Sequence, residues 1–328
     1  MALSWQSIHL AAYREATRVH RELSLDLTRA IDPFAALAAL GVVVIRRPLS
    51  GAAGLYLPSE PPDRQSAGVL VNVLHPVSKQ RYTAAHELGH HRRDRQAIID
   101  SDTEWLARGE DQQSDRERLA EAFAAWFLMP KPLVLSVLDR MDVRPNQLTP
   151  GGAYRLALEL GTSYQATVNH LGDLRLIASS QRRGLLQASP RSVKEALGAR
   201  TAAPDLRRDV WQIDPVRDPA PVRAAAGDLL VVDLEETPSS GYLWSVTVPN
   251  GVSLVSDEWM ANNSAPLGGE GTHRFWLSLD RPGVSVVRLE KRRPWRSEAT
   301  GHSEVAVEAV DRPAVGIVEP EQLVAASA

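Results

Sequence analysis

The pattern of apolar residues changes near residue 210, and this change constrains the fold more than any other feature of the chain. Before it, apolar residues recur mostly at helical spacing, interrupted by short β-branched runs between residues 42 and 71. After it, short β-branched runs follow one another with turn residues between them, as in Leu229–Val232 and Val284–Val287. We therefore expect an α+β domain followed by an all-β sandwich.

The length of 328 residues also supports two domains, because one hydrophobic core seldom organises so long a chain. We place the first domain at residues 1–178 and the second at residues 205–328, joined by a linker at residues 179–204. The stretch of residues 179–221 is rich in Ala, Pro and Arg, and we expect a single helix in it, at Val193–Leu197.

Composition excludes several classes of function. The chain has no cysteine, which rules out a disulfide framework, a thiolate zinc site and a cysteine nucleophile. Its formal net charge of -3 provides no general attraction to nucleic acid or to an anionic membrane. The first ten residues lack the pattern of a secretory signal, and no stretch reaches the ~20 apolar residues of a membrane helix. We expect a cytoplasmic protein that does not bind a membrane.

A histidine pair with metal-ligand spacing lies in a helix predicted from Lys79 to Arg95. His86 and His90 are four residues apart and face the same way, while Glu87 projects beside them. Zinc lowers the pKa of a coordinated water toward ~7, and a neighbouring carboxylate can take its proton during attack on a peptide carbonyl. The alternative is a coincidental pair of histidines, but the apolar neighbours of the motif on its helix favour a metal site.

A third protein ligand must come from elsewhere, leaving one position open for water. The helix predicted at Asp115–Met129 carries two candidates, Glu117 and Glu121. Glu117 also has the spacing of a capping residue, because Ser114 precedes it by three positions, so residue spacing leaves both candidates open. The electrophile for the carbonyl oxygen is equally open. Its candidates are Tyr82, Tyr154, Tyr164 and His170.

Three motifs in this region resemble the ImmA/IrrE family of metallopeptidases, over about residues 5–178. They are Arg81–His90, Glu117–Ala124 and Leu128–Pro130. The resemblance implies a helical zincin-like domain with a small β-sheet, in which Glu117 joins His86 and His90 around one zinc ion. It also implies a protein substrate, a transcriptional repressor cleaved in a stress or mobile-element response. Glu121 departs from the family, whose members often carry Asn at that position.

Two short apolar helices expected between residues 156 and 177 admit two interpretations. Joined at Gly161, they are compatible with a DNA-binding helix-turn-helix, a segment that the family resemblance includes. Few basic residues lie on the second of these helices, so we favour packing against the catalytic helices and do not expect binding to nucleic acid.

Three turn segments of the second domain, each with a neighbouring aromatic or glycine residue, resemble the loops of the chagasin family of cysteine-peptidase inhibitors, over about residues 205–325. The resemblance implies an immunoglobulin-like β-sandwich whose three loops wedge into a papain-type cleft. Ser239 and Ser240 stand where the family usually has threonine, and Thr237 stands where it usually has asparagine. The candidate partner-binding residues are Thr237, Pro238, Ser239, Ser240, Gly241, Tyr242, Gly268, Gly269, Arg293, Pro294 and Trp295.

The function predicted from these features is that of a zinc-dependent endopeptidase in which Glu87 is the catalytic base. A His/His/Glu set also accepts manganese or iron. For the sandwich we consider three uses: a module that binds substrate or partner, an inhibitor of a cysteine peptidase, and a regulatory cover for the metal site. A metal-binding sensor without catalysis is the remaining alternative.

Overall fold

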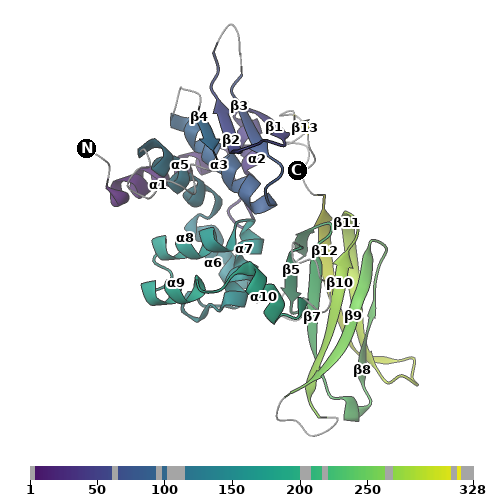
Figure 1. Ribbon diagram of the computed structural model, residues 1–328. Helices are drawn as coiled ribbons and strands as arrows, with labels where there is room; N and C mark the ends of the chain where they lie inside the picture. The colour runs from purple at the N-terminus through teal and green to yellow at the C-terminus, as the bar shows by residue number, and fades with distance from the viewer. Residues whose placement is uncertain are drawn as a thin grey trace. The chain divides into compact units, whose positions relative to one another are not determined.

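The structure, a computed structural model, describes residues 4–60, 66–93, 98–101, 115–199, 208–215, 221–262, 269–311 and 316–318. It divides into two compact units (Figure 1). The first draws on Met1–Leu138, Leu156–Arg183 and Pro313–Ala328, and the second on Asp139–Arg155 and Gly184–Arg312. The expected α+β class is confirmed, since helices and a mixed sheet form the first unit and a β-sandwich forms the second. The domain boundaries at residues 178 and 205 stay a prediction.

The first unit begins with two helices whose start signals are visible in the sequence. Helix α1 (Trp5–Glu22) begins after Ser4, whose side chain accepts a hydrogen bond from the backbone N–H of Ser7 at 3.1 Å. Helix α2 (Pro33–Ala39) begins after Asp32, which caps it in the same way, with proline at the first helical position. The buried residues of α1 recur every three or four positions, so one face of this helix packs against the core.

A five-stranded sheet forms the other layer of the first unit. Its order is β13-β1-β3-β2-β4, with β1 and β3 parallel and the other neighbours antiparallel. The sheet joins strands from both ends of the chain. Its strands are β1 (Val43–Arg47), β2 (Ala52–Leu57), β3 (Gly68–Asn72), β4 (Ile98–Ser101) and β13 (Gly316–Val318).

Helix α3 (Val77–Arg93) packs between this sheet and α5 (Asp115–Leu128), and α1 covers the far side of α5. Residues 102–114, which precede α5, lie outside the described residues. Proline at position 130 stops α5, and the ring nitrogens of His20 and His170 pair with the last carbonyl oxygens, those of Phe127 at 2.9 Å and Met129 at 3.1 Å. The remaining helices are α6 (Lys131–Arg140), η1 (Pro145–Gln147), α7 (Pro150–Leu160), α8 (Tyr164–Asp173), α9 (Ser179–Leu185) and α10 (Pro190–Ala196).

In the described part of the chain no single helix is long and apolar enough to cross a membrane. Helices α5 and α6 reach that length and composition only together, and the chain bends by 41° between them.

The second unit is a sandwich of two four-stranded sheets, ordered β5-β7-β10-β9 and β6-β12-β11-β8. The central strand β7 is buried on both faces, which explains its unbroken apolar start. The strands are β5 (Val210–Ile213), β6 (Val222–Ala225), β7 (Leu229–Glu236), β8 (Leu243–Thr247), β9 (Val252–Ala261), β10 (Gly271–Leu279), β11 (Gly283–Arg292) and β12 (Ala299–Val310).

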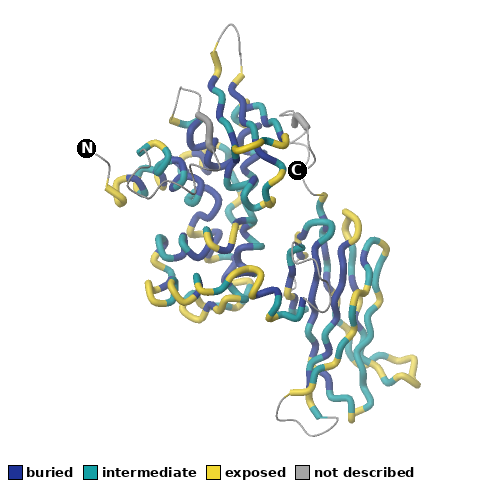
Figure 2. The backbone as a smooth tube through the Cα atoms, viewed as in Figure 1, coloured by how far each residue is buried: buried dark blue, intermediate teal, exposed yellow. Residues whose placement is uncertain are grey.

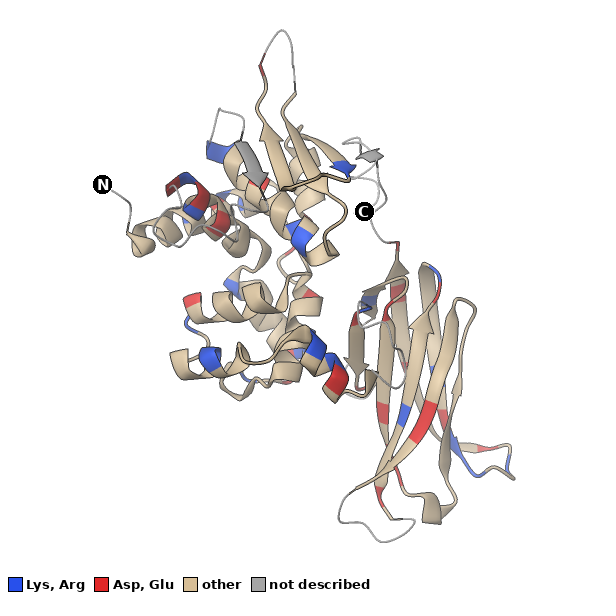
Figure 3. Cartoon of the chain, in the orientation of Figure 1, with Lys and Arg blue, Asp and Glu red and all other residues tan. Residues whose placement is uncertain are grey.

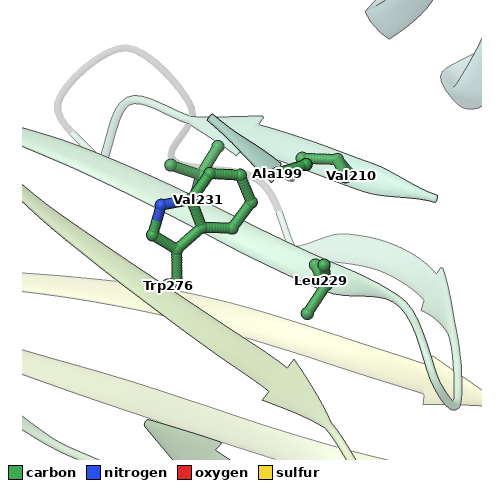
Figure 4. Packing of buried hydrophobic residues seen from close by; sticks show 5 residues of the cluster. All are labelled: Ala199, Val210, Leu229, Val231 and Trp276. Atoms are coloured by element: carbon green, nitrogen blue, oxygen red, sulfur yellow. The ribbon is translucent and has the colours of Figure 1, made fainter. Parts of the chain in front are cut away.

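The outer face of the β5-β7-β10-β9 sheet packs against the segment that we expected to be a linker. Leu229 and Val231 of β7 form one apolar cluster with Val210 of β5, Trp276 of β10 and Ala199 (Figure 4). The expectation of a single helix at Val193–Leu197 was incomplete, because residues 179–199 contain both α9 and α10. A polar anchor accompanies the apolar cluster, since Lys194 of α10 donates from Nζ to the backbone oxygen of Arg208 at 2.7 Å.

Candidate functional site

The candidate metal ligands begin on α3, a helix buried on all sides in its second half. Every residue from Thr83 to His90 is buried, because strands β2 and β3 lie on one side and α5 on the other. His86 and His90 lie one turn apart on the face toward α5, with their Nε2 atoms 3.0 Å from each other. The two imidazoles therefore present their ring nitrogens to one point, as the spacing predicts.

The structure brings Glu117, near the start of α5, to the same point. Its Oε2 atom lies 3.3 Å from Nε2 of His86 and 3.6 Å from Nε2 of His90. One ligand atom from each of the three residues falls within 4.8 Å of the others, so the group could hold a metal ion. Within the described residues this is the only such group of three or more His, Cys, Asp or Glu side chains.

Gly89 permits the close approach of the two helices that this cluster requires. A Cβ atom at Gly89 would lie 3.2 Å from the Cα atom of Ala120 and 3.1 Å from Cδ1 of Phe123, both on α5. Any larger residue would push α5, and Glu117 with it, away from the histidines. The glycine between Leu88 and His90 therefore has a packing role that the motif alone does not reveal.

The histidines determine the charge state of Glu117. Burial by itself would raise the pKa of this carboxyl group, but the hydrogen bonds and charge of His86 and His90 outweigh burial and lower it well below its usual range. The side chain of Glu117 is 19% exposed, so solvent reaches the cluster from this side. Glu117 is therefore an ionised carboxylate at neutral pH, which is the form that binds metal.

Glu87 faces a different neighbour, strand β2. One residue after His86, it is rotated by about 100° around the helix, and its side chain is fully buried. A Cβ atom at Gly54 would lie 2.8 Å from Oε1 of Glu87 and 2.4 Å from Cγ2 of Thr83, so only glycine lets β2 pass this close. Sequence reasoning missed Gly54, whose one signal is a glycine inside a strand pattern.

The four candidate electrophiles lie on different elements and have different partners. The hydroxyl of Tyr82 donates to the backbone oxygen of Glu121 at 3.0 Å, which ties α3 to α5. Tyr154 belongs to the second unit, where its hydroxyl donates to Asp209 at 3.0 Å. The ring of His170 is buried against the end of α5, and Tyr164 is buried at the start of α8. These contacts assign none of the four to the metal cluster.

The candidate partner-binding loops form a second site, at one end of the sandwich. Thr237–Tyr242 folds into a turn that contains a short 3-10 helix, η2 (Pro238–Ser240). This helix is followed by Gly241, which has a φ of 76°. The hydroxyl of Ser240 donates to the Thr237 oxygen at 2.7 Å and accepts from the Tyr242 N–H at 3.3 Å. Serine at position 240 thus keeps the turn together without the methyl group of threonine.

The loop that contains Arg293, Pro294 and Trp295 packs beside this turn. A Cβ atom at Gly241 would lie 3.3 Å from Cη2 of Trp295. The guanidinium of Arg293 lies 4.6 Å from the ring centre of Tyr242 and 6.0 Å from that of Trp295. Trp295 is nevertheless 70% exposed. The hairpin between β11 and β12 that carries it has an exposed tip (Figure 2).

The third loop connects β9 to β10, and only part of it is described. Gly268 lies outside the described residues, whereas Gly269 is included and exposes part of its surface. Gly271 pairs with Ala261 of β9 and with Glu236 of β7, so the third loop ends beside the residue from which the first loop leaves the sheet.

The first unit thus carries a His/His/Glu cluster on packed helices, and the second carries an aromatic loop rim on a sandwich. Residues 37–171 match the family described as the IrrE N-terminal-like domain, a peptidase family. Residues 223–308 match the chagasin family of peptidase inhibitors. One segment of the chain therefore matches each family, which confirms the resemblance found in the motifs.

Individual proteins resemble the second domain. Chagasin from Trypanosoma cruzi is 28% identical over 82 residues, which cover 23% of this chain and 74% of chagasin. A cysteine protease inhibitor from Entamoeba histolytica has a TM-score of 0.28 and 23% identity, covering 31% of this chain and 97% of the inhibitor. PbICP-C, solved in complex with falcipain-2, has a TM-score of 0.22 and 16% identity, covering 32% of this chain and 91% of PbICP-C.

Proposed function

We propose that the first domain is a zinc-dependent endopeptidase. The observation that carries the proposal is the convergence of His86, His90 and Glu117 within 4.8 Å, with Glu87 on the same helix. Two imidazoles and one carboxylate are a donor set of catalytic zinc sites, which keep one position open. The donors are ready to bind, because Glu117 is ionised and the histidine ring nitrogens already converge on it.

In this mechanism His86, His90 and Glu117 would hold the ion. A bound zinc ion would supply Lewis acidity, which polarises a peptide carbonyl and makes water a stronger acid. The carboxylate of Glu87 accepts a proton from the attacking water and then delivers it to the departing amine nitrogen. Full burial against β2 keeps bulk water away from this carboxylate.

We propose a narrow protein substrate for this activity, a transcriptional repressor cleaved in the cytoplasm during a stress or mobile-element response. The match of residues 37–171 to the IrrE N-terminal-like family supports this proposal. An adjacent repressor gene would name the first substrate to test.

The test separates metal binding from proteolysis. Glu87→Gln keeps the shape of the side chain but removes the base, so we expect it to bind zinc normally and to cleave the candidate repressor at least 100-fold more slowly, about the usual contribution of a general base. His90→Ala should lose both zinc and cleavage. An unchanged cleavage rate in Glu87→Gln contradicts the mechanism. Zinc binding by the wild type without cleavage of any repressor would indicate a sensor.

A second function, binding of a cysteine peptidase, is favoured by the packed rim of Gly241, Arg293 and Trp295 on the second domain. We expect the full chain to inhibit papain, and Trp295→Ala to weaken inhibition about 10-fold or more, as for a central aromatic contact. Trp5→Ala is the matched control, since Trp5 is 52% exposed but lies on α1. Equal inhibition by both variants excludes this rim. Absence of inhibition leaves substrate binding and regulatory covering of the metal site as the uses of the sandwich.

A further inference from the structure

Three titratable side chains meet inside the sandwich, at the base of the loop Thr237–Tyr242. His273 of β10 lies between two carboxylates, with Nδ1 at 2.9 Å from Oε2 of Glu236 on β7 and Nε2 at 2.5 Å from Oδ1 of Asp257 on β9. Glu236 is 3% exposed and His273 is 8% exposed, whereas the side chain of Asp257 is about half exposed at 49%. We call these three residues the buried triad.

The buried triad is connected to both ends of the loop. Glu236 is the last residue of β7, directly before Thr237, and its Oε2 atom also accepts the backbone N–H of Trp244 on β8 at 2.5 Å. The indole of Trp244 donates to the backbone oxygen of Glu235 at 3.0 Å. One carboxylate therefore joins the residue before the loop to a residue just after it.

A buried carboxylate is costly unless it is paired, so Glu236 depends on its donors. A protonated imidazole can donate from both nitrogens, one to each carboxylate. Burial alone would lower the pKa of His273, but its hydrogen bonds to Glu236 and Asp257 and their charges raise it. The ring is further fixed by stacking on Phe275, at 4.3 Å between ring centres.

Other charged groups around His273 are engaged elsewhere. Arg274, the next residue on β10, points to the opposite face of the sheet, where its Nε atom lies 2.6 Å from Oδ1 of Asp233 on β7. Glu258 on β9 lies opposite Arg274, so the three residues form a row of alternating charge across the strands (Figure 3). From the facing sheet, Lys291 of β11 lies over the ring of Trp244 and donates to the Glu235 oxygen at 3.3 Å. Glu236 and Asp257 are the groups that act directly on His273.

We propose that His273 is a positioning residue for the loop Thr237–Tyr242. While His273 is protonated, it holds the Glu236 carboxylate in its hydrogen bond with the Trp244 amide. When His273 loses this proton, the loop loosens and partner binding weakens. The inference rests on the proposed binding of a cysteine peptidase. Because the folded-state pKa of His273 is raised, the stabilisation is complete at low pH and is lost as pH rises through that value. Binding should therefore weaken toward alkaline pH.

The first measurement follows the loop anchor without any partner. In the full chain labelled with ¹⁵N-tryptophan, the Trp244 amide signal, assigned through Trp244→Phe, should titrate on the alkaline side of the free histidine value of about 6.5. Asp257→Asn removes one charge from a half-exposed position that tolerates substitution, so it should move the midpoint to lower pH. A Trp244 amide signal that does not titrate between about pH 6 and about pH 9 overturns the proposal.

The second measurement compares papain inhibition by His273→Gln and His302→Gln over the same pH range. His302 lies on β12 and is exposed, so His302→Gln is the matched control. Its inhibition profile also reports how the pH dependence of papain itself affects the assay. The wild type and His302→Gln should lose affinity relative to His273→Gln as pH rises, because only these two proteins carry the histidine whose proton holds the loop. Parallel profiles for all three overturn the proposal. If papain is never inhibited, the peptidase-binding function fails, and the Trp244 titration still decides whether His273 anchors the loop.

Discussion

Gly54→Ala probes the approach of strand β2 to helix α3. The new Cβ atom would lie 2.4 Å from Cγ2 of Thr83 and 2.8 Å from Oε1 of Glu87. Carbon atoms in contact rest at about 3.5–4.0 Å, so the strand or the Thr83 side chain must move by about 1 Å. Such overpacking costs about 1–3 kcal/mol, while alanine regains about 0.5–1 kcal/mol of the entropy that glycine loses on folding. We expect a net loss of about 1–2 kcal/mol in the free energy of unfolding.

The cluster of His86, His90 and Glu117 faces α5 rather than β2, so Gly54→Ala should leave zinc content unchanged while cleavage falls with the displacement of Glu87. Denaturant unfolding, metal analysis and the cleavage rate measure the three quantities. Thr83→Ser removes the closest contacting atom and provides a double-mutant cycle, in which it should recover part of the lost stability. A variant as stable and as active as the wild type refutes the close packing of β2 on Glu87.

Three further predictions follow from single residues. Glu117→Gln should lose zinc binding by about 10-fold or more while Glu121→Gln keeps it, measured by competition with a chelator; similar losses in both would contradict the ligand assignment. His170 is buried with its pKa lowered to about 4 by burial, so below about pH 6.5 the unfolded chain binds the extra proton. The free energy of unfolding should then fall by about 1.4 kcal/mol per pH unit toward about pH 4, a slope that His170→Gln reduces in denaturant titrations at several pH values. Lys194→Met should lower the stability of the sandwich by about 1–3 kcal/mol, since it removes a buried hydrogen bond to Arg208, and unchanged unfolding would argue against α10 as part of that unit.

The helical part of the candidate site could be predicted because its information is local. Four-residue spacing alone places His86 and His90 on one face of α3. The choice between Glu117 and Glu121 could not be made in this way, since the two lie one turn apart on the same helix. The family resemblance favours Glu117, and the packing of α5 on α3 at Gly89, between residues about 30 positions apart, brings it to the histidines in the structure.

Features that depend on long-range pairing were missed. Gly54 is an ordinary strand glycine until β2 is placed over Glu87. Helix α10 was only partly anticipated, because it is short and carries few apolar side chains. Its contacts are made with the sandwich, through residues distant in the sequence. Strand β13 is only three residues long, and its pairing with β1 leaves no pattern in the sequence.

The pairing of β13 with β1 has consequences for engineering this chain. The sandwich is interposed in sequence between segments that both belong to the first unit, so removing everything after residue 178 would not yield an intact peptidase domain. Such a truncation would remove the strand that pairs with β1 and would leave backbone amides and carbonyls of β1 unpaired at the sheet edge. Exposed edges of this kind favour pairing between molecules and aggregation. Shortened variants meant to isolate the first unit should retain Gly316–Val318 through a short connector, so that β1 keeps its neighbouring strand.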